Sequence, residues 1–165
     1  VKLGEKHSIY HYELVKKGFL LRPRTDGRIL SEIQAEELLE TDLVEIHPEM
    51  LLKDLIPLIQ KSHRNWFPVV ENDKDGEFVG MVYFNDIKHY VFNPDLVNTI
   101  IVEEVMQSDL VTVSLTHNTA DILALFDNTG AWSLPVIEGN KFRGLISKAT
   151  ILDHYRKELK AQTED

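Results

Sequence analysis

The sequence contains no cysteine, which excludes disulfide bonds, thiol catalysis and cysteine-based zinc sites together. No apolar run approaches the roughly 18 residues that a membrane-spanning helix requires. Phosphate-binding Walker loops, nucleophile elbows and His-Glu-x-x-His motifs are also missing. We therefore expect neither an enzyme nor a metal site in this chain.

Positive charge is scarce, because 18 Lys and Arg stand against 27 Asp and Glu and the formal net charge is −9. A phosphate-neutralising surface needs clustered Lys and Arg, so this composition argues against a nucleic-acid partner. Basic residues gather at the N-terminus, where seven lie at or before Arg28 against three acids. This segment is either a solvated arm or a connector on the cytoplasmic side of a membrane. Since the chain opens on Val1, we expect it to be part of a longer protein.

A stretch typical of a β-hairpin occurs twice in the chain. From Phe67 to Ile87, two runs of β-branched and aromatic residues flank an Asp75-Gly76 turn, which is a strong hairpin signal. The same pattern returns from Leu134 to Ile151, with Gly144 at the place of Gly80. The chain therefore contains a tandem repeat.

The register of this repeat is regular. From Ile33 onward, residues match those 67 positions later, as Asp42-Leu43-Val44 matches Asp109-Leu110-Val111. After the hairpin turn the offset falls to 64, because the first turn is three residues longer than the second. A length change confined to a turn indicates a true duplication.

Hydrophobic periodicity predicts the order strand, helix, two hairpin strands and closing helix in each copy. We expect first strands at 43–46 and 110–113, helices at 51–61 and 119–128, and closing helices at 85–91 and 148–161. A single β-α-β-β-α unit is too small to bury both faces of its sheet, so the two copies should pack about a pseudo-two-fold axis. The predicted fold class is therefore α/β (α+β), with an N-terminal helical connector at 1–32, repeat 1 at 33–95 and repeat 2 at 96–165.

Two local features are expected within the connector. Ser8 and Gly18 bound a short predicted helix, as N-cap and C-terminal stop. Residues 19–30, which contain Pro23 and Asp26-Gly27, are predicted to form a turn or a small hairpin.

The double unit resembles a pair of CBS domains, a Bateman module, over about Ile33 to Arg156. The resemblance is carried by Phe-Pro-Val-Val leading into a Val-Gly-Met-Val strand, with an acid at the next helix start. The segment SIYHYELVKKG is similar to the one that joins the last membrane helix of bacterial ClC chloride channels and transporters to their cytoplasmic CBS pair. It is this second match that favours the connector over the solvated arm.

The resemblance implies regulation rather than catalysis. It implies a cytoplasmic pair that modulates ion transport, on the cytoplasmic side of the inner (plasma) membrane and within an integral membrane protein. The implied partners are the transmembrane ClC domain of the same chain, a second copy bound through the CBS helices, and AMP, ADP or ATP as a regulatory ligand between the repeats.

The family's ligand chemistry uses a carboxylate at the start of the closing helix to hold ribose hydroxyls, with apolar strand residues around the base. Copy one keeps the acid, Asp86, but has Tyr83 where a small hydroxyl is expected, whereas copy two has Ser147 and loses the acid to Thr150. The resemblance implies an adenosine-type cleft of Asp86, Asn85, Val111 and Trp132. A second, degraded cleft comprises Val44, Arg64, Ser147 and Thr150.

Other interpretations stay open. The chain could be an adenylate-sensing CBS module of a soluble enzyme, which predicts tight AMP or ATP binding through Asp86, or a ligand-free dimerisation scaffold. Asp86 has a structural alternative as an acid that interacts with the free amides of its helix N-terminus. Trp132 has one as an interface or core aromatic.

Overall fold

The computed structural model describes residues 25–164 of the chain. Contacts divide these residues into two compact units. Unit 1 comprises the described residues of 25–40, 111–138 and 143–164, and unit 2 comprises 41–110 and 139–142. The helix expected at 8–18 lies outside the described residues.

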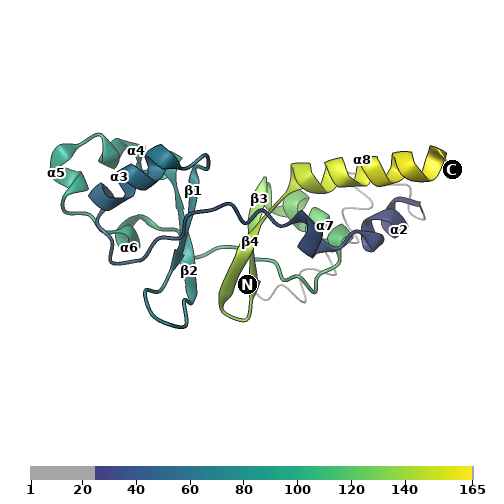
Figure 1. Ribbon diagram of the computed structural model, residues 1–165, viewed down its shortest axis with the longest axis horizontal. Coiled ribbons are helices and arrows are strands. Elements are labelled where there is room, and N and C mark those ends of the chain that lie inside the picture. Colours follow the sequence, from purple (N-terminus) through teal and green to yellow (C-terminus); the bar gives the residue numbers. More distant parts are fainter. Residues whose placement is uncertain (1–24, 165) are drawn as a thin grey trace. The chain divides into compact units, whose positions relative to one another are not determined.

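Unit 2 is a two-stranded sheet with helices packed on it (Figure 1). Strand β1 pairs antiparallel with β2, with Phe67 opposite Val82 and an irregularity between Val69 and Val70. Residue Ile46 adds a single parallel bridge to Val69. In chain order the elements are α3 (Leu52–Lys61), β1 (Trp66–Val70), β2 (Phe78–Tyr83), α4 (Phe84–Val91), α5 (Pro94–Val97) and α6 (Val102–Val105).

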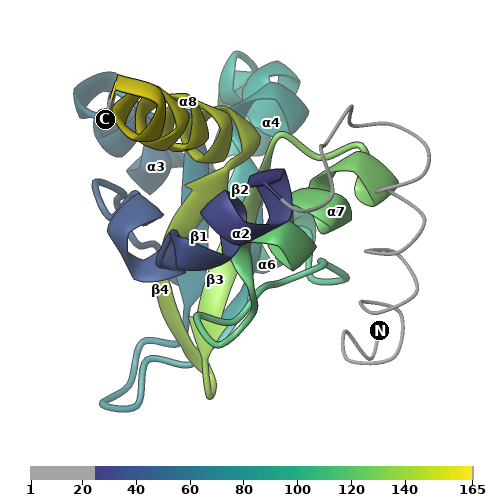
Figure 2. The ribbon, with the colours of Figure 1, turned by 90° about the vertical axis from the view of Figure 1, so that its right-hand side faces the viewer.

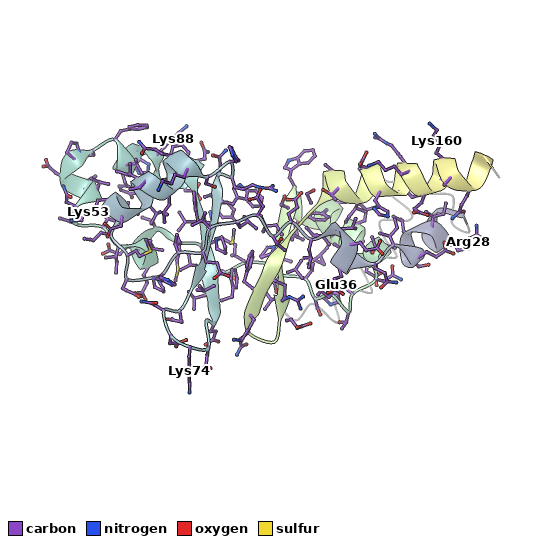
Figure 3. The ribbon with its side chains drawn as sticks, viewed as in Figure 1. Arg28, Glu36, Lys53, Lys74, Lys88 and Lys160 are labelled. Atoms are coloured by element: carbon purple, nitrogen blue, oxygen red, sulfur yellow. The ribbon has the colours of Figure 1, made fainter. Side chains whose placement is uncertain are left out.

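Local sequence explains where these elements begin and end. In the β1–β2 turn, the carboxylate of Asp73 accepts hydrogen bonds from the amides of Asp75 and Gly76, and Gly76 has a φ of 56°. Lys74 extends from this turn (Figure 3). After α4, the side chain of Asn93 caps α5, which Pro94 opens at a position where its missing N–H costs nothing. The turn chemistry thus delivers the hairpin that the sequence predicts.

The core of unit 2 lies between the hairpin and its helices. Most of the buried side chains belong to α3, where they recur at helical spacing, to the inward face of β1 and β2, and to α4, α5 and α6. They are Ile46, Leu52, Leu55, Phe67, Val69, Val82, Ile87, Val97 and Val102.

Unit 1 has the same kind of core, formed by helices packed on a two-stranded sheet. Strands β3 and β4 form a two-stranded sheet, and Val113 makes a parallel bridge to Val136. Helix α2 packs against both α7 and α8 (Figure 2). Arg28 of α2, labelled in Figure 3, donates a 3.2 Å hydrogen bond to the Gln162 side chain of α8. The elements are α2 (Thr25–Glu32), the 3₁₀ helix η1 (Ala35–Leu38), α7 (Thr119–Thr129), β3 (Ser133–Glu138), β4 (Lys141–Ser147) and α8 (Lys148–Glu164).

The predicted fold class is confirmed, since each repeat supplies the predicted helices and hairpin strands. Two local predictions are wrong. The first strands at 43–46 and 110–113 reduce to single bridges at Ile46 and Val113, because only those residues pair with the sheet. Of the turn expected at 19–30, residues 19–24 lie outside the described residues, and 25–30 are helical, because Ile29 and Leu30 are buried and favour the helix. The two compact units are defined by contacts, whereas the two repeats are defined by sequence, so the units do not test the repeat boundaries. The boundaries at 32 and 95 therefore stay predictions.

Candidate ligand-binding sites

Two chain segments run close to the hairpin strands at equivalent positions of the two units. In unit 2, Gln107 and Met81 exchange backbone hydrogen bonds of 2.8 and 2.9 Å. In unit 1, Glu40 and Leu145 do the same, also at 2.8 and 2.9 Å. Glu40 and Gln107 are 67 residues apart, and Met81 and Leu145 are 64 apart, which are the two offsets of the repeat. The duplication therefore places Glu40 and Gln107 at corresponding positions. We call the segments that contain these two residues the bridging segments.

Glycine makes both approaches possible. A Cβ on Gly80 would lie 2.6 Å from the carbonyl oxygen of Gln107, and one on Gly144 would lie 2.8 Å from that of Glu40. Real Cβ atoms do not come this close to backbone oxygens. Gly144 also has a φ of 150°, which L side chains rarely adopt. The two glycines that the repeat shares are thus needed so that each segment can lie beside its strand.

In unit 2 this arrangement forms what we call the α4 site, made of Tyr83, Asp86 and Gln107. Asp86 lies in the first turn of α4, and its Oδ2 accepts a 2.6 Å hydrogen bond from the side-chain amide of Gln107. Burial, and secondly the negative charge of Asp86, raise the pKa of the Tyr83 hydroxyl above its ordinary value of 10.0. Tyr83 also packs edge-on against Trp66, with ring centroids 5.1 Å apart. The α4 site therefore presents a carboxylate beside an amide donor and a neutral phenol.

In unit 1 the corresponding group is the α8 site, made of Glu40, Ser147 and Thr150. Oε1 of Glu40 accepts a hydrogen bond from Oγ1 of Thr150 at 3.2 Å and a long one from Oγ of Ser147 at 3.5 Å. The two hydroxyls are 2.7 Å apart, and Oγ of Ser147 also accepts from the Thr150 amide. All three side chains are half-buried. The α8 site thus contains one carboxylate and two hydroxyls.

Each site contains one carboxylate and at least one hydrogen-bond donor, but the carboxylate lies on a different element in each. The carboxylate lies on the helix in the α4 site, at Asp86, and on the bridging segment in the α8 site, at Glu40. Residue Thr150, which takes the place of Asp86 in repeat 2, faces Glu40 instead. The sequence interpretation included neither Glu40 nor Gln107, although the offset of 67 aligns them.

The other predicted residues fall in both units. Asn85 is exposed and precedes Asp86 in α4, and Val44 packs on the core of unit 2. The side chain of Arg64 lies 3.8 Å from the carboxylate of Asp42. Val111 packs on the core of unit 1, and Trp132 is 74% exposed. Each cleft implied by the resemblance thus takes two residues from each unit, and both clefts stay predictions.

Trp132 borders a pocket of about 170 Å³ within unit 1. Lys148 forms an ion pair with Asp127, and its Nζ lies 5.9 Å from the centre of the Trp132 ring. The Lys148 amide donates to the Trp132 carbonyl at 3.0 Å, which fixes the start of α8 beside the tryptophan. The pocket is lined by Phe126, Asp127, Gly130, Ala131, Trp132 and Lys148. With its ring exposed, Trp132 is not a core aromatic of unit 1.

Two further observations concern the described part of the chain as a whole. Among residues 25–164, no three His, Cys, Asp or Glu side chains gather as metal ligands would. No helix described by the structure has both the length and the apolar character needed to cross a bilayer.

Two units that each combine a helix, a β-hairpin and a closing helix, with matching segments bridged to the hairpins, define a tandem α/β module. The CBS domain family matches this chain over residues 35–93 and 102–157, which covers most of it and both repeats. The chain therefore belongs to the CBS domain family and carries a tandem pair of CBS domains.

Known proteins resemble the chain over most of its length. An uncharacterized protein of Methanocaldococcus jannaschii is 28% identical over 121 residues, which is 73% of this chain and 43% of that protein. The chain thus spans less than half of this curated relative.

Solved structures show the same fold. The CBS domain of a bacterial CNNM/CorC family Mg²⁺ transporter in complex with ATP superposes with a TM-score of 0.66 at 20% identity, covering 79% of this chain and 92% of that one. A hexameric CBS-CP12 protein from bloom-forming cyanobacteria has a TM-score of 0.58 at 27% identity, covering 73% of this chain and 66% of that one.

Proposed function

We propose that this chain is a regulatory CBS pair that binds an adenine nucleotide and passes the bound state to an attached partner. CBS domains are regulatory rather than catalytic modules. The observation that carries the proposal is the carboxylate of Asp86 at the start of α4, held at 2.6 Å by the amide of Gln107. A carboxylate accepts hydrogen bonds from ribose hydroxyls, and hydrogen bonds to a charged group contribute roughly 1.5–3 kcal/mol. The ATP complex of the transporter CBS domain supports adenine nucleotide as the ligand class.

Isothermal calorimetry with ATP, ADP and AMP tests this proposal. We expect binding to the wild-type chain, and Asp86→Asn should weaken it about tenfold or more, since about 1.4 kcal/mol corresponds to a factor of ten. Asp95→Asn is the matched control, because Asp95 is an exposed acid in the first turn of α5 in the same unit. Equal affinities of the Asp86→Asn and Asp95→Asn variants would contradict the role of Asp86.

The ligand-free scaffold makes the opposite thermal prediction. A ligand that binds only the folded state stabilises it by about 2.7 kcal/mol at one hundred times its Kd. The melting temperature should therefore rise with ATP concentration, and no rise at millimolar ATP would favour the scaffold.

For the attached partner, we propose a transmembrane transport domain of the ClC type, with the CBS pair on the cytoplasmic side of the inner membrane. The basic N-terminal segment and the similarity of SIYHYELVKKG to the ClC connector support it. The residues encoded upstream of Val1 test it, because a series of apolar spans is expected there. A soluble domain in that position would instead establish the alternative, an adenylate-sensing module of a soluble enzyme.

We also propose that the chain forms a homodimer through its helices. Phe92, at the end of α4, supports an apolar contact because it is 78% exposed. Light scattering of the same samples measures the oligomeric state, and a monomer at all concentrations would count against the dimer.

A further inference from the structure

We propose that Glu40 is the ligand carboxylate of unit 1, so that the α8 site binds a vicinal diol independently of Asp86. This inference rests on the proposed function, the binding of an adenine nucleotide, and concerns the site where repeat 2 lacks the helix acid. It assigns two carboxylate sites to the pair in place of one.

The first step is the fixed position of Glu40. Its backbone is held to Leu145 by a pair of hydrogen bonds, and the absence of a Cβ at Gly144 allows that close approach. Two backbone bonds place the carboxylate at the start of α8, where Oε1 meets Thr150 Oγ1 at 3.2 Å. A half-buried acid held in this way is pre-organised for a ligand rather than free to move over the surface.

The second step is the chemistry of the group. A carboxylate only accepts hydrogen bonds, and its two oxygens can serve the two hydroxyls of a vicinal diol. Ser147 and Thr150 carry hydroxyls that both donate and accept, so they can reorient when a ligand hydroxyl donates to Glu40. The α8 site therefore offers complementary partners to a ribose with both its 2′ and 3′ hydroxyls.

The third step is the correspondence with the α4 site. The repeat offsets place Glu40 at the position of Gln107 and Thr150 at that of Asp86. In both sites a carboxylate meets a hydrogen-bond donor across the same pair of elements, at 2.6 Å in one and 3.2 Å in the other. Each site therefore keeps one acid. In the α4 site the acid extends from the helix, and in the α8 site it extends from the bridging segment.

A purely structural role would make Glu40 a link between the bridging segment and α8. Such a link would influence stability without influencing which ligand binds. The two roles are therefore separated by ligand selectivity, which a change in folding stability alone does not alter.

Calorimetry in an Asp86→Asn background tests the inference, with ATP and 2′,3′-dideoxy-ATP as probes. We expect Asp86→Asn to retain one ATP site, and the added Glu40→Gln to weaken that site about tenfold. Dideoxy-ATP should bind the Asp86→Asn variant about tenfold more weakly than ATP does, and this difference should disappear in the Asp86→Asn/Glu40→Gln variant. Glu36→Gln is the matched control, because Glu36 is an exposed acid of unit 1 that lies 3.6 Å from Arg143.

Three results would overturn the inference. If Asp86→Asn alone abolishes ATP binding, the α8 site holds no nucleotide, although the proposed function stands. The same conclusion follows if Glu40→Gln lowers the melting temperature but leaves ATP affinity and diol selectivity unchanged. If the wild-type chain binds no nucleotide, the proposed function fails and the inference falls with it.

Discussion

Tyr83 ends β2 directly before α4, half-buried against Trp66 and near the carboxylate of Asp86. Burial disfavours its phenolate, and the charge of Asp86 adds to that effect, so the pKa of the hydroxyl is raised above 10.0. In the α4 site the side chain is therefore a neutral phenol at physiological pH and not a charge. It fills the place of the small hydroxyl that Ser147 supplies in repeat 2.

This raised pKa predicts a loss of stability in alkali. Above about pH 10 the unfolded chain loses the Tyr83 proton while the folded chain still holds it, so the free energy of unfolding falls as pH rises through the folded pKa. Below about pH 10 the neutral Tyr83 hydroxyl makes its full contribution to the free energy of unfolding. We expect Tyr83→Phe to lose less stability than the wild type between about pH 9 and about pH 11, measured by urea unfolding.

Tyr90→Phe serves as the control, because Tyr90 is another half-buried tyrosine of unit 2. Parallel loss of stability in the wild type and in the Tyr83→Phe variant would contradict the prediction. Tyrosinate absorbance measured through the same pH range would show directly whether Tyr83 ionises late.

At the same scale, the sequence predicted some residues of the two candidate sites and missed others. Asp86 was predictable because an acid at a helix start after a β-hairpin is a local pattern. Glu40 was not, because its contact with Thr150 spans 110 residues and depends on the bridge to Leu145. The repeat aligns Glu40 with Gln107, but the alignment of an acid with an amide does not by itself indicate a shared role. The fold shows that both contact the start of a closing helix.

Among the elements, the approach of the Glu40 segment to β4 is constrained both by close backbone contact and by a positive φ. Gly144→Ala would place a Cβ 2.8 Å from the Glu40 carbonyl oxygen and would force a side chain to adopt a φ of 150°. We expect the variant to lose about 2–4 kcal/mol of unfolding free energy, from overpacking and backbone strain together. Urea denaturation measures this loss.

Gly27→Ala is the matched control for that experiment. Gly27 lies within α2, and a Cβ there would meet nothing within 4 Å. Alanine in a helix interior is favoured over glycine by about 0.5–1 kcal/mol, so this variant should be as stable as the wild type or more so. A Gly144→Ala variant as stable as Gly27→Ala would show that the segment can move away from β4 at little cost.

The elements also show which part of the fold the sequence could specify. Helices α3, α7 and α8 were predicted because their apolar residues recur at helical spacing, and the hairpins because turn residues separate β-branched runs. The first strands were overpredicted, since a short, largely apolar stretch such as Leu43 to Ile46 is also compatible with a segment that pairs at one residue only. Helix α2 was missed because Asp26-Gly27 is a turn signal, which burial of Leu30 overrides.

For the whole molecule, unit 1 depends on residues that precede both strands of its sheet. Leu30, Ile33 and Leu38 are each at most 5% exposed and belong to the same core as α7 and β3. Burial of three such side chains contributes roughly 5–9 kcal/mol, which approaches the whole stability of a typical domain. A chain that begins at Thr41 should therefore fail to fold unit 1.

Hydrogen exchange measures this outcome when residues 41–165 are compared with residues 25–165. We expect the amides of α7 and β3 to lose protection in the shorter chain only. Buried Thr119, which donates to the Ile33 carbonyl at 2.7 Å, lies at the junction that the truncation removes. Equal protection of α7 in the two chains would show that α2 and η1 are dispensable.

The division of the chain between the units has a consequence for synthesis on the ribosome. The described part of unit 1 begins with α2 and η1 but is completed only when α8 emerges, whereas most of unit 2 is the continuous stretch 41–110. At about 5–20 residues per second, the roughly 120 residues from α2 to α8 take on the order of 6–24 s to be made, and the apolar side chains of α2 wait that long for α8. Helix α2 is thus made before unit 2 but is buried only after it, and nascent unit 1 exposes its apolar face to chaperones while unit 2 is already taking shape.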